Sequence, residues 1–339
     1  MTFYYPKEFF DNSARWHIFP LLKSLLKEAQ NMTEDFSMSE SLEKADFVII
    51  PMSWNYYYRC NKIAQVLEYY SQLPNKKQVI SFVFGDFGVK VPSVYKGLVF
   101  RASGYKSKLP ENHVGLPVFI EDPLKKHYNQ EIIFNKPYSK EAIIGFCGQA
   151  KSLGLHNIED YLKLGLKNML SIIGYGNRDL EPLMSATYLR FQILKSLKRS
   201  NNVICNFIIR KKYRAGITLE KDQHSSTQEF YENINNSDYI LCVRGAGNFS
   251  TRFYETLAMG RIPVFVNTDC LLPLSHIIDW EKHVVWVEYN ERHLIAEKIA
   301  GFHSLHDETS LNQLFLKNRQ LWKEHIQLYS FFNTFLNAD

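Results

Sequence analysis

The residues best suited to chemistry lie in one short stretch between positions 237 and 267. An apolar strand (Tyr239 to Val243) leads into a glycine-containing loop, a helix that begins near Ser250, a stop at Gly260 and a second apolar strand (Ile262 to Val266). Glycines before a helix let a ligand approach the backbone, and the unpaired N–H groups of the first helical turn favour an anion. The residues that could form such a site are Arg244, Gly245, Gly247, Ser250, Arg252 and Glu255.

These residue types predict a pocket for a nucleoside diphosphate. Arg244 and Arg252 place positive charge on either side of the helix start, where phosphate groups would lie. Glu255 follows Arg252 by three residues, so both share roughly one helix face, and its carboxylate can accept hydrogen bonds from sugar hydroxyls. The same pattern also fits a structural role, with an N-cap serine and a surface ion pair. Neither G-x-G-x-x-G nor G-x-x-x-x-G-K-[ST] occurs here, which excludes a dehydrogenase or P-loop interpretation.

Length and composition limit the class of protein. A chain of 339 residues is about the size at which one core divides into two domains. The net charge of +5 suits an anionic small molecule or a loose approach to anionic lipid. A nucleic-acid partner is not expected, because no dense Lys/Arg stripe interleaved with aromatic residues is present. The five cysteines form no C-x-x-C pair, so we expect neither disulfides nor a zinc site.

The chain also carries no pattern that predicts export or a membrane span. Its first twenty residues lack the basic start and continuous apolar core of a signal peptide. No apolar run approaches the length that crosses a bilayer. We therefore expect a cytoplasmic protein, with peripheral association at the inner face of the membrane as an option.

The first part of the chain alternates helical and strand patterns. Residues 18–29 and 61–73 have helical spacing, and residues 45–51 and 78–84 have the composition of buried strands. The order favours a parallel sheet covered by helices. In such sheets ligands bind beyond the carboxyl ends of the strands, and two motifs occupy that position.

The first of these motifs is the aromatic cluster SWNYYY at residues 53–58. Trp54, Tyr56 and Tyr57 could stack on an acceptor sugar or pack against a neighbouring domain. The second is GDFG at residues 85–88, whose Asp86 could be a general base, a hydrogen-bond acceptor for substrate or a turn residue. It is not the kinase Asp-Phe-Gly, since the other kinase signatures do not precede it.

The second part repeats the alternation after a polar linker at residues 122–140. Further strands are predicted at 98–101, 115–120, 142–147, 203–209 and 284–289, and further helices at 158–170, 185–197, 227–236 and 291–303. Residues 210–228 are polar and basic, which predicts either a loop over the cleft or plain solvated surface. The expected domains are 1–138 and 139–309, followed by a C-terminal helix (310–339) whose apolar face packs back on the first domain.

The segment CVRGAGNFSTRFYETLAMGRIPVFV, followed by IDWEKHVVWVEY, resembles the donor-binding core of the exostosin family, glycosyltransferases of the GT47 type. The residues that match the family pattern one by one are Ser250, Arg252, Glu255, Gly260, Ile262, Pro263, Val264, Asp279 and Trp280. Weaker similarities lie upstream in ADFVIIPMSWNYY, FVFGDFG, GLPVFIEDP and IGFCGQA. The chain departs from the pattern at Val243, where the family commonly has proline, and residues 211–226 do not align.

The resemblance implies a GT-B fold, in which two Rossmann-like domains face each other across a cleft. The second domain would hold a UDP-sugar without a metal or other cofactor, and the first would hold a glycan or lipid-linked glycan acceptor. The donor-binding residues would be Arg244, Gly245, Gly247, Ser250, Arg252, Glu255, Gly148 and Arg190. The acceptor-binding residues would be Trp54, Tyr56 and Tyr57.

An inverting transfer also needs a base that deprotonates the acceptor hydroxyl. Asp86 is the first candidate, with Glu121 and Asp122 at the end of another first-domain strand as fallbacks. The resemblance thus implies an inverting glycosyltransferase, which we expect to act in surface polysaccharide synthesis. A nucleotide-sugar epimerase or hydrolase of the same fold and a non-catalytic glycan-binding protein are the alternatives.

Overall fold

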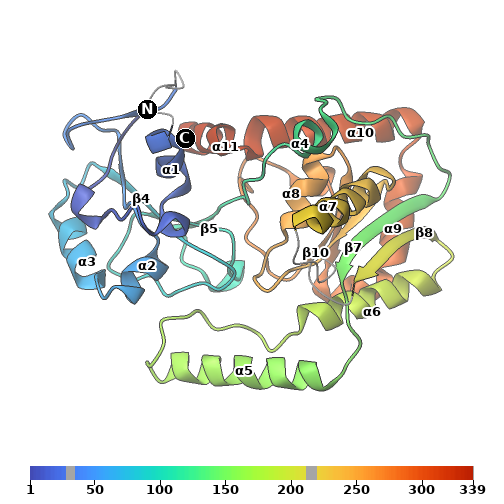
Figure 1. Ribbon diagram of the computed structural model, residues 1–339, viewed down its shortest axis with the longest axis horizontal. Coiled ribbons are helices and arrows are strands. Elements are labelled where there is room, and N and C mark those ends of the chain that lie inside the picture. Colours follow the sequence, from blue (N-terminus) through green and yellow to red (C-terminus); the bar gives the residue numbers. More distant parts are fainter. Residues whose placement is uncertain (28–34, 211–219, 339) are drawn as a thin grey trace.

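The computed structural model describes residues 1–27, 35–210 and 220–338. The chain forms two parallel sheets with helices around them, arranged side by side along the long axis of the molecule (Figure 1). The strand order is β2-β1-β3-β4-β5-β6 in the first sheet and β11-β10-β9-β7-β8 in the second. Two parallel α/β domains are what the prediction of a GT-B architecture requires, and this prediction is confirmed.

The first domain builds its sheet from short strands. They are β1 (Thr2–Tyr4), β2 (Ser37–Met38), β3 (Phe47–Ile49), β4 (Gln78–Val83), β5 (Leu98–Arg101) and β6 (His113–Gly115). The helices are α1 (Pro20–Lys27), α2 (Trp54–Arg59), α3 (Ile63–Gln72) and α4 (Pro123–Tyr128). The strands are apolar along most of their length because helices cover both faces of the sheet.

The second domain has longer strands, and it contains the stretch between residues 237 and 267. Its strands are β7 (Ala142–Gln149), β8 (Val203–Arg210), β9 (Tyr239–Cys242), β10 (Ile262–Asn267) and β11 (Val285–Glu288). Its helices are α5 (Leu155–Ile172), α6 (Ala186–Arg199), α7 (Glu220–Asn235), α8 (Thr251–Ala258) and α9 (Ile295–Ser304). Gly260 has φ +64°, a left-handed conformation that ends the turn between α8 and β10 without a Cβ penalty.

Three predicted segments differ from the structure. The strand expected at 115–120 ends at Gly115, because Pro117 has no N–H with which to continue the ladder. The expected linker at 122–140 contains α4, which Asp122 caps and Pro123 begins. The loop expected at 210–228 is helical from Glu220, while residues 211–219 lie outside the described part.

The C-terminal segment, predicted as one helix that packs on the first domain, forms two helices that span both domains (Figure 1). Helix α10 (Glu308–Leu321) contributes Leu311, Leu314 and Phe315 to the core of the second domain. A short π turn (Trp322–Ile326) then leads to α11 (Leu328–Asn337). Phe332 of α11 packs against Phe19 and Phe100 of the first domain.

Buried polar contacts join the two domains beneath the cleft. The side chain of Asn248 donates to the carbonyls of Gly104, Thr268 and Asp269, and its backbone N–H donates to the Ser103 hydroxyl. An ion pair between buried Arg101 and partly exposed Asp179 adds a second link, with 2.5 Å between Nη2 and Oδ2. These contacts fix the position of the first-domain loops relative to the second domain.

Gly247 lies where the GDFG loop meets the second domain. A Cβ at this position would come within 2.4 Å of the Asp86 carbonyl oxygen and 2.9 Å of the Asp86 Cα. Both are backbone atoms, so the loop would have to move. The predicted phosphate-binding glycine is therefore a point of contact between domains.

We expect Gly247→Ala to lower the free energy of unfolding by about 1–3 kcal/mol, because the added methyl group meets backbone that cannot rotate away. Gly245→Ala is the matched control, since a Cβ there meets no atom closer than 3.6 Å. Urea denaturation of both variants measures the difference. Equal effects at the two positions would contradict this role for Gly247.

Candidate active site

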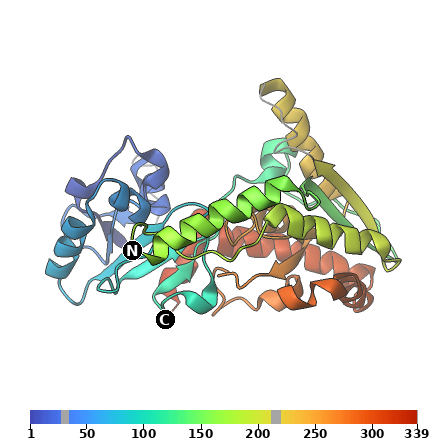
Figure 2. The same ribbon diagram turned by 90° about the horizontal axis from the view of Figure 1, so that it is seen from below.

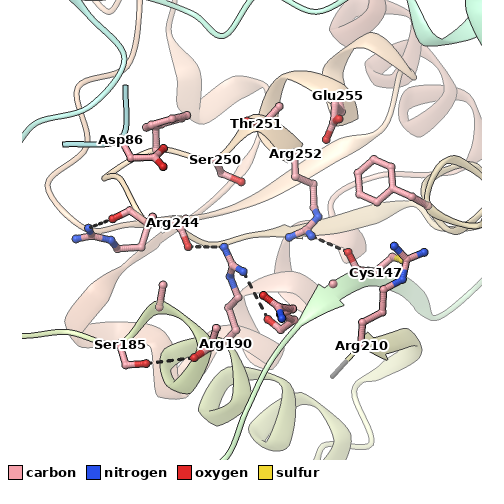
Figure 3. Close-up of a pocket in the computed structure, with 18 of the residues that line it drawn as sticks. Asp86, Cys147, Ser185, Arg190, Arg210, Arg244, Ser250, Thr251, Arg252 and Glu255 are labelled. Carbon is pink, nitrogen blue, oxygen red and sulfur yellow. Dashed lines mark hydrogen bonds between the residues drawn. The ribbon is translucent and has the colours of Figure 1, made fainter. Parts of the chain in front are cut away.

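A cavity of about 1300 Å³ lies between the domains. The first domain and α4 contribute Asp86, Phe87, Lys126 and His127. The second domain contributes the carboxyl ends of β7 and β8, one side of α5, and the first turns of α6 and α8 (Figure 3). This is the position at which open parallel sheets bind ligands.

Arg252 occupies the middle of this cavity (Figure 3). Its Nη2 donates to the Cys147 carbonyl at 2.7 Å, and its guanidinium lies over the Phe146 ring at 4.5 Å. A Cβ on Gly148 would come within 2.7 Å of Nη2, so the glycine makes room for this side chain. The buried Nε has no hydrogen-bond partner.

Arg190 reaches the same point from α6. Its Nη2 donates to the Arg244 carbonyl at 2.7 Å, and its buried Nε has no hydrogen-bond partner. Burial, together with the charges of Arg252 and Arg244, lowers the pKa of Arg190 to about 9. The site therefore holds guanidinium groups that repel one another, and a bound anion would relieve that repulsion.

Arg244 differs from these two arginines because its charge is already paired. Its guanidinium bonds to the Tyr105 hydroxyl and lies 3.2 Å from the Glu181 carboxylate, and all three side chains are buried. Its contribution to the cavity includes the backbone carbonyl that accepts from Arg190. The predicted role in neutralising diphosphate is therefore better filled by Arg190 and Arg252.

Two helices begin at the cavity. Ser185 caps α6 by accepting from the Tyr188 N–H, whereas the Ser250 side chain makes no capping hydrogen bond to α8. Ser250 and Thr251 line the cavity beside Gly245. The positive ends of both helix dipoles thus add to the arginine charges.

The charge of the cavity is strongly positive. Of the described lining residues, seven are lysine or arginine and three are carboxylates. The cations are Lys126, Lys163, Lys167, Arg190, Arg210, Arg244 and Arg252, and the carboxylates are Asp86, Glu181 and Glu255. Arg244 is paired with Glu181, and Lys126, Lys163 and Arg210 are paired with carboxylates outside the lining. The positive charge that could act on an anionic ligand is therefore concentrated at Arg190 and Arg252.

Glu255 lies one turn along α8 from Arg252 (Figure 3). Its carboxylate accepts a hydrogen bond from the Tyr231 hydroxyl of α7. Arg252 extends instead toward the strand carbonyls, so the surface ion pair that was the structural alternative does not describe this helix. Glu255 therefore lies where it could accept hydrogen bonds from hydroxyl groups of a ligand.

Asp86 enters the cavity from the first domain (Figure 3). Its side chain is exposed on the cavity surface, yet the surrounding protein desolvates it enough to raise the pKa of its carboxyl. The loop that holds it contacts Gly247 and follows β4 directly. A carboxylate with a raised pKa that faces a cationic cavity from the opposite domain is suited to accept a proton.

The aromatic residues predicted to bind an acceptor do not reach the cavity. Trp54, Tyr56 and Tyr57 are buried in the first domain. The Trp54 indole N–H donates to the Ser81 hydroxyl, and the Tyr56 hydroxyl donates to Asp11. These bonds correct the prediction: the short α2 turns the rings into the core of the first domain, so they neither face the cavity nor pack against the neighbouring domain.

The two fallback bases also have other partners. Glu121 is exposed and forms an ion pair with Lys126. Asp122 caps α4 and forms a bidentate pair with Arg319 of α10, at 2.9 Å and 2.5 Å. Neither carboxylate lines the cavity, which leaves Asp86 as the described first-domain carboxylate that does.

We expect Asp122→Ala to lower the free energy of unfolding by about 3–5 kcal/mol, because it leaves the buried Arg319 charge unpaired. The exposed neighbour provides a control, and Glu121→Ala should change stability little. Chemical denaturation followed by tryptophan fluorescence measures both variants. A small effect of Asp122→Ala would argue against a structural role for this residue.

Several residues of the cavity were not predicted. Arg210 lies at the carboxyl end of β8, where its buried Nε has no partner, and its position after a predicted strand could have identified it. Phe230 of α7 places its ring 5.7 Å from the Arg252 guanidinium. Lys163 and Lys167 of α5 carried no sequence signal, because the helix that brings them to the cavity lies outside the motif.

Comparison with known proteins identifies the part of the chain around this cavity. Residues 183–299 match the family model described as the Exostosin GT47 domain. Over these residues the chain is similar to an exostosin GT47 domain. The matched range holds the greater part of the cavity, from α6 and β8 to Glu255.

Several relatives are similar over short segments. A protein of Physcomitrium patens named "Probable glucuronosyltransferase 47 A" is 30% identical over 96 residues, which cover 28% of this chain and 20% of that protein. "Probable glucuronosyltransferase GUT1" of Oryza sativa subsp. japonica is 37% identical over 60 residues, which cover 18% and 14%. "Exostosin-1 homolog" of Caenorhabditis elegans is 34% identical over 73 residues, which cover 22% and 19%. These matches span about a fifth or less of the relatives' own length.

Two solved structures are similar over more of the chain, but at lower sequence identity. "Crystal Structure of TarM" covers 94% of this chain and 57% of its own, at 11% identity and a TM-score of 0.34. "Spinosyn Rhamnosyltransferase SpnG complexed with thymidine diphosphate" covers 94% and 79%, at 8% identity and a TM-score of 0.36. Likeness at these scores adds nothing to what the sheets and the cavity establish.

Two further findings concern the described residues as a whole. They include no group of three or more His, Cys, Asp or Glu side chains that could hold a metal ion. They also include no helix both long and apolar enough to cross a membrane.

Proposed function

We propose that this protein transfers a sugar from a nucleoside diphosphate donor to a glycan hydroxyl, with inversion at the anomeric carbon. The observation that carries the proposal is the cavity in which Arg190 and Arg252 converge beside two helix N-termini, with Asp86 entering from the other domain. The second-domain side of the cavity would supply positive charge for the departing diphosphate, and the first-domain side would supply a base for the acceptor hydroxyl.

The reaction would proceed in one displacement. Asp86 takes the proton of the acceptor hydroxyl as its oxygen bonds to the anomeric carbon. The bond between that carbon and the diphosphate oxygen breaks, and the nucleoside diphosphate leaves with the electron pair. Arg190, Arg252 and the first turn of α8 stabilise the charge that develops on the diphosphate. These groups supply positive charge without a metal ion, so we propose that transfer needs none.

The donor in this proposal is a UDP-sugar. Glu255 and the Tyr231 hydroxyl form a polar wall at the far side of Arg252 from Asp86, where the nucleoside ribose would lie. Two relatives carry "glucuronosyltransferase" in their names, and the excess of cations over carboxylates in the cavity would suit an acidic sugar. UDP-glucuronate is therefore the first donor to test.

The acceptor in this proposal is a glycan of a surface polysaccharide, free or linked to a lipid, and transfer would take place in the cytoplasm. The first-domain side of the cavity, around Asp86 and Phe87, would receive it. A screen of acceptor glycans would identify which glycan receives the sugar.

The test is a thermal unfolding screen with UDP, GDP and a set of their sugars, because a ligand in excess over its Kd raises the apparent stability. We expect UDP and one or a few UDP-sugars to raise the Tm. Product analysis of the stabilising sugar without acceptor then separates the alternatives. Release of free sugar or an epimer would indicate a hydrolase or epimerase, and no stabilisation by any nucleotide would indicate a glycan-binding protein.

A further inference from the structure

One aromatic side chain remains exposed beside Asp86. Phe84 directly follows β4 and is 37% exposed to solvent. Two chain steps, at most about 7.6 Å, separate its Cα from the Cα of Asp86. Phe87 of the same loop is covered on one side, because the cationic groups of Lys167 and Arg178 lie 5.7 Å from its ring centre. Figure 1 and Figure 2 show that α5, which carries Lys167, runs from the second domain to the edge of the first.

His17 packs its ring against Phe84. The two ring centres are 5.1 Å apart with 67° between their planes, which is an edge-to-face pair. The Nδ1 atom of His17 lies 2.7 Å from the hydroxyl oxygen of Ser53, and this bond holds the ring in place. The other ring nitrogen, Nε2, makes no hydrogen bond to any residue that the structure describes. The half-buried imidazole can therefore exchange a hydrogen bond with a hydroxyl group of a ligand.

Asn55 is a second polar residue beside Phe84. Its Oδ1 atom accepts from the backbone N–H of Phe84 at 2.8 Å. Its Nδ2 group has no hydrogen-bond partner within the described ranges, and the side chain is half-buried. Asn55 belongs to the SWNYYY motif, in which the rings of Trp54, Tyr56 and Tyr57 are buried. The residue of this motif that can reach a ligand with two N–H donors is thus the asparagine.

These three residues meet at the carboxyl edge of the first sheet. The Ser53 N–H donates to the His17 carbonyl at 2.8 Å, which ties His17 to the chain that follows β3. Asn55 lies in the first turn of α2, and Phe84 follows β4, which pairs with β3. Asp86 lies at the same edge and lines the cavity. The surface formed by His17, Asn55 and Phe84, here called the Phe84 surface, therefore continues the cavity onto the first domain.

We propose that the Phe84 surface holds the acceptor sugar whose hydroxyl group loses its proton to Asp86. One face of the sugar ring packs on the Phe84 ring, while Nε2 of His17 and Nδ2 of Asn55 form hydrogen bonds with its oxygen atoms. Such a site selects a pyranose with at least one face free of axial hydroxyl groups, because an axial hydroxyl would separate the two rings. The inference rests on the proposed function and names the residues that would recognise the acceptor.

The test is saturation-transfer difference NMR of the full chain in the presence of UDP. The probes are the methyl β-glycosides of glucose, galactose, N-acetylglucosamine and glucuronic acid. We expect at least one glycoside to receive saturation, most strongly on the C–H protons of one ring face. Phe84→Ala should weaken its binding at least about tenfold, because the aromatic contact is lost, whereas Phe84→Trp should retain it.

Asn55→Asp tests the polar part of the surface. The aspartate keeps an oxygen that can accept from the Phe84 N–H, but it lacks the Nδ2 donors. We expect it to weaken binding of the same glycoside by about 2- to 10-fold, the usual effect of one lost hydrogen bond. The Tm of each variant is recorded with its binding, so that a loss through unfolding is recognised.

Tyr138→Ala is the matched control. Tyr138 is 38% exposed and its ring stacks on His303 at 5.6 Å, but it precedes β7 and so lies away from the carboxyl edges of the strands. This variant should bind the glycoside as the wild type does. Wild type that receives no signal with any of the four probes, or Phe84→Ala that binds equally well, would overturn the Phe84 surface.

Calorimetric titration with UDP separates this inference from the proposed function. UDP binding without binding of any glycoside would overturn the Phe84 surface and leave the donor site standing. Glycoside binding that depends on Phe84, in a protein that binds no nucleotide, would support the surface and overturn the proposed transfer.

Discussion

Asp86→Asn is expected to lower the rate of sugar transfer by about 10²- to 10⁴-fold, the usual contribution of a general base. The amide has nearly the shape of the carboxylate but cannot take a proton from the acceptor hydroxyl. Asp86 lies on the other side of the cavity from the residues that would hold the nucleoside, so the affinity for UDP should stay close to that of the wild type. Initial rates and calorimetric titration with UDP measure the two effects.

The pH dependence gives this prediction a second readout. Desolvation raises the pKa of Asp86, so the acid limb of kcat/KM should lie above the range usual for an aspartate. Activity falls as pH decreases through that pKa, because a protonated carboxyl group is no longer a base. The Asn variant should lose this limb. Glu121→Gln is the control, and loss of transfer there with full activity of the Asp86 variant would reassign the base.

Arg252→Ala is expected to weaken UDP binding about 10- to 100-fold, since a hydrogen bond to a charged group is worth about 1.5–3 kcal/mol. The guanidinium lies 4.5 Å from the Phe146 ring and 5.7 Å from the Phe230 ring, so aromatic contacts hold this side chain at the cavity. Calorimetric titration with UDP measures the loss. Because the residue also bonds to the Cys147 carbonyl, the Tm of the variant must be recorded as well.

Uridine provides the control ligand for this variant. If Arg252 acts on the diphosphate, the loss should be large for UDP and small for uridine, which carries no phosphate. Arg252→Lys keeps the charge but not the fork of donors, so it should restore part of the affinity. An equal loss for UDP and uridine would indicate that Arg252 holds the strands in place and does not bind the diphosphate.

Local sequence patterns determined much of the second domain. The unit from Tyr239 to Asn267 has the strand, the helix start after Ser250, the Gly260 stop and the second strand where the residues predicted them. The prediction of this unit succeeded because strand alternation, helix starts and glycine stops are local signals that do not depend on residues distant in the chain. The same signals missed α4 and the start of α7, where polar composition concealed helices.

The sequence could not predict which groups each side chain contacts. Gly247 looked like a phosphate-binding glycine, yet its space is taken by the Asp86 backbone from the other domain. Arg244 looked like a free cation, yet Glu181, 63 residues away, pairs with it. Trp54 and its neighbours looked accessible, yet α2 turns them into the core. In each case the deciding partner is distant in the chain.

The sequence by itself therefore determined the two parallel domains and part of the lining of the cavity, because these depend on periodicity and on residues that are neighbours in the chain. The tertiary structure decided which arginines remain available, which carboxylate faces them and which aromatic ring beside that carboxylate is exposed. Those properties depend on contacts between domains, and spacing along one strand or helix carries no information about them.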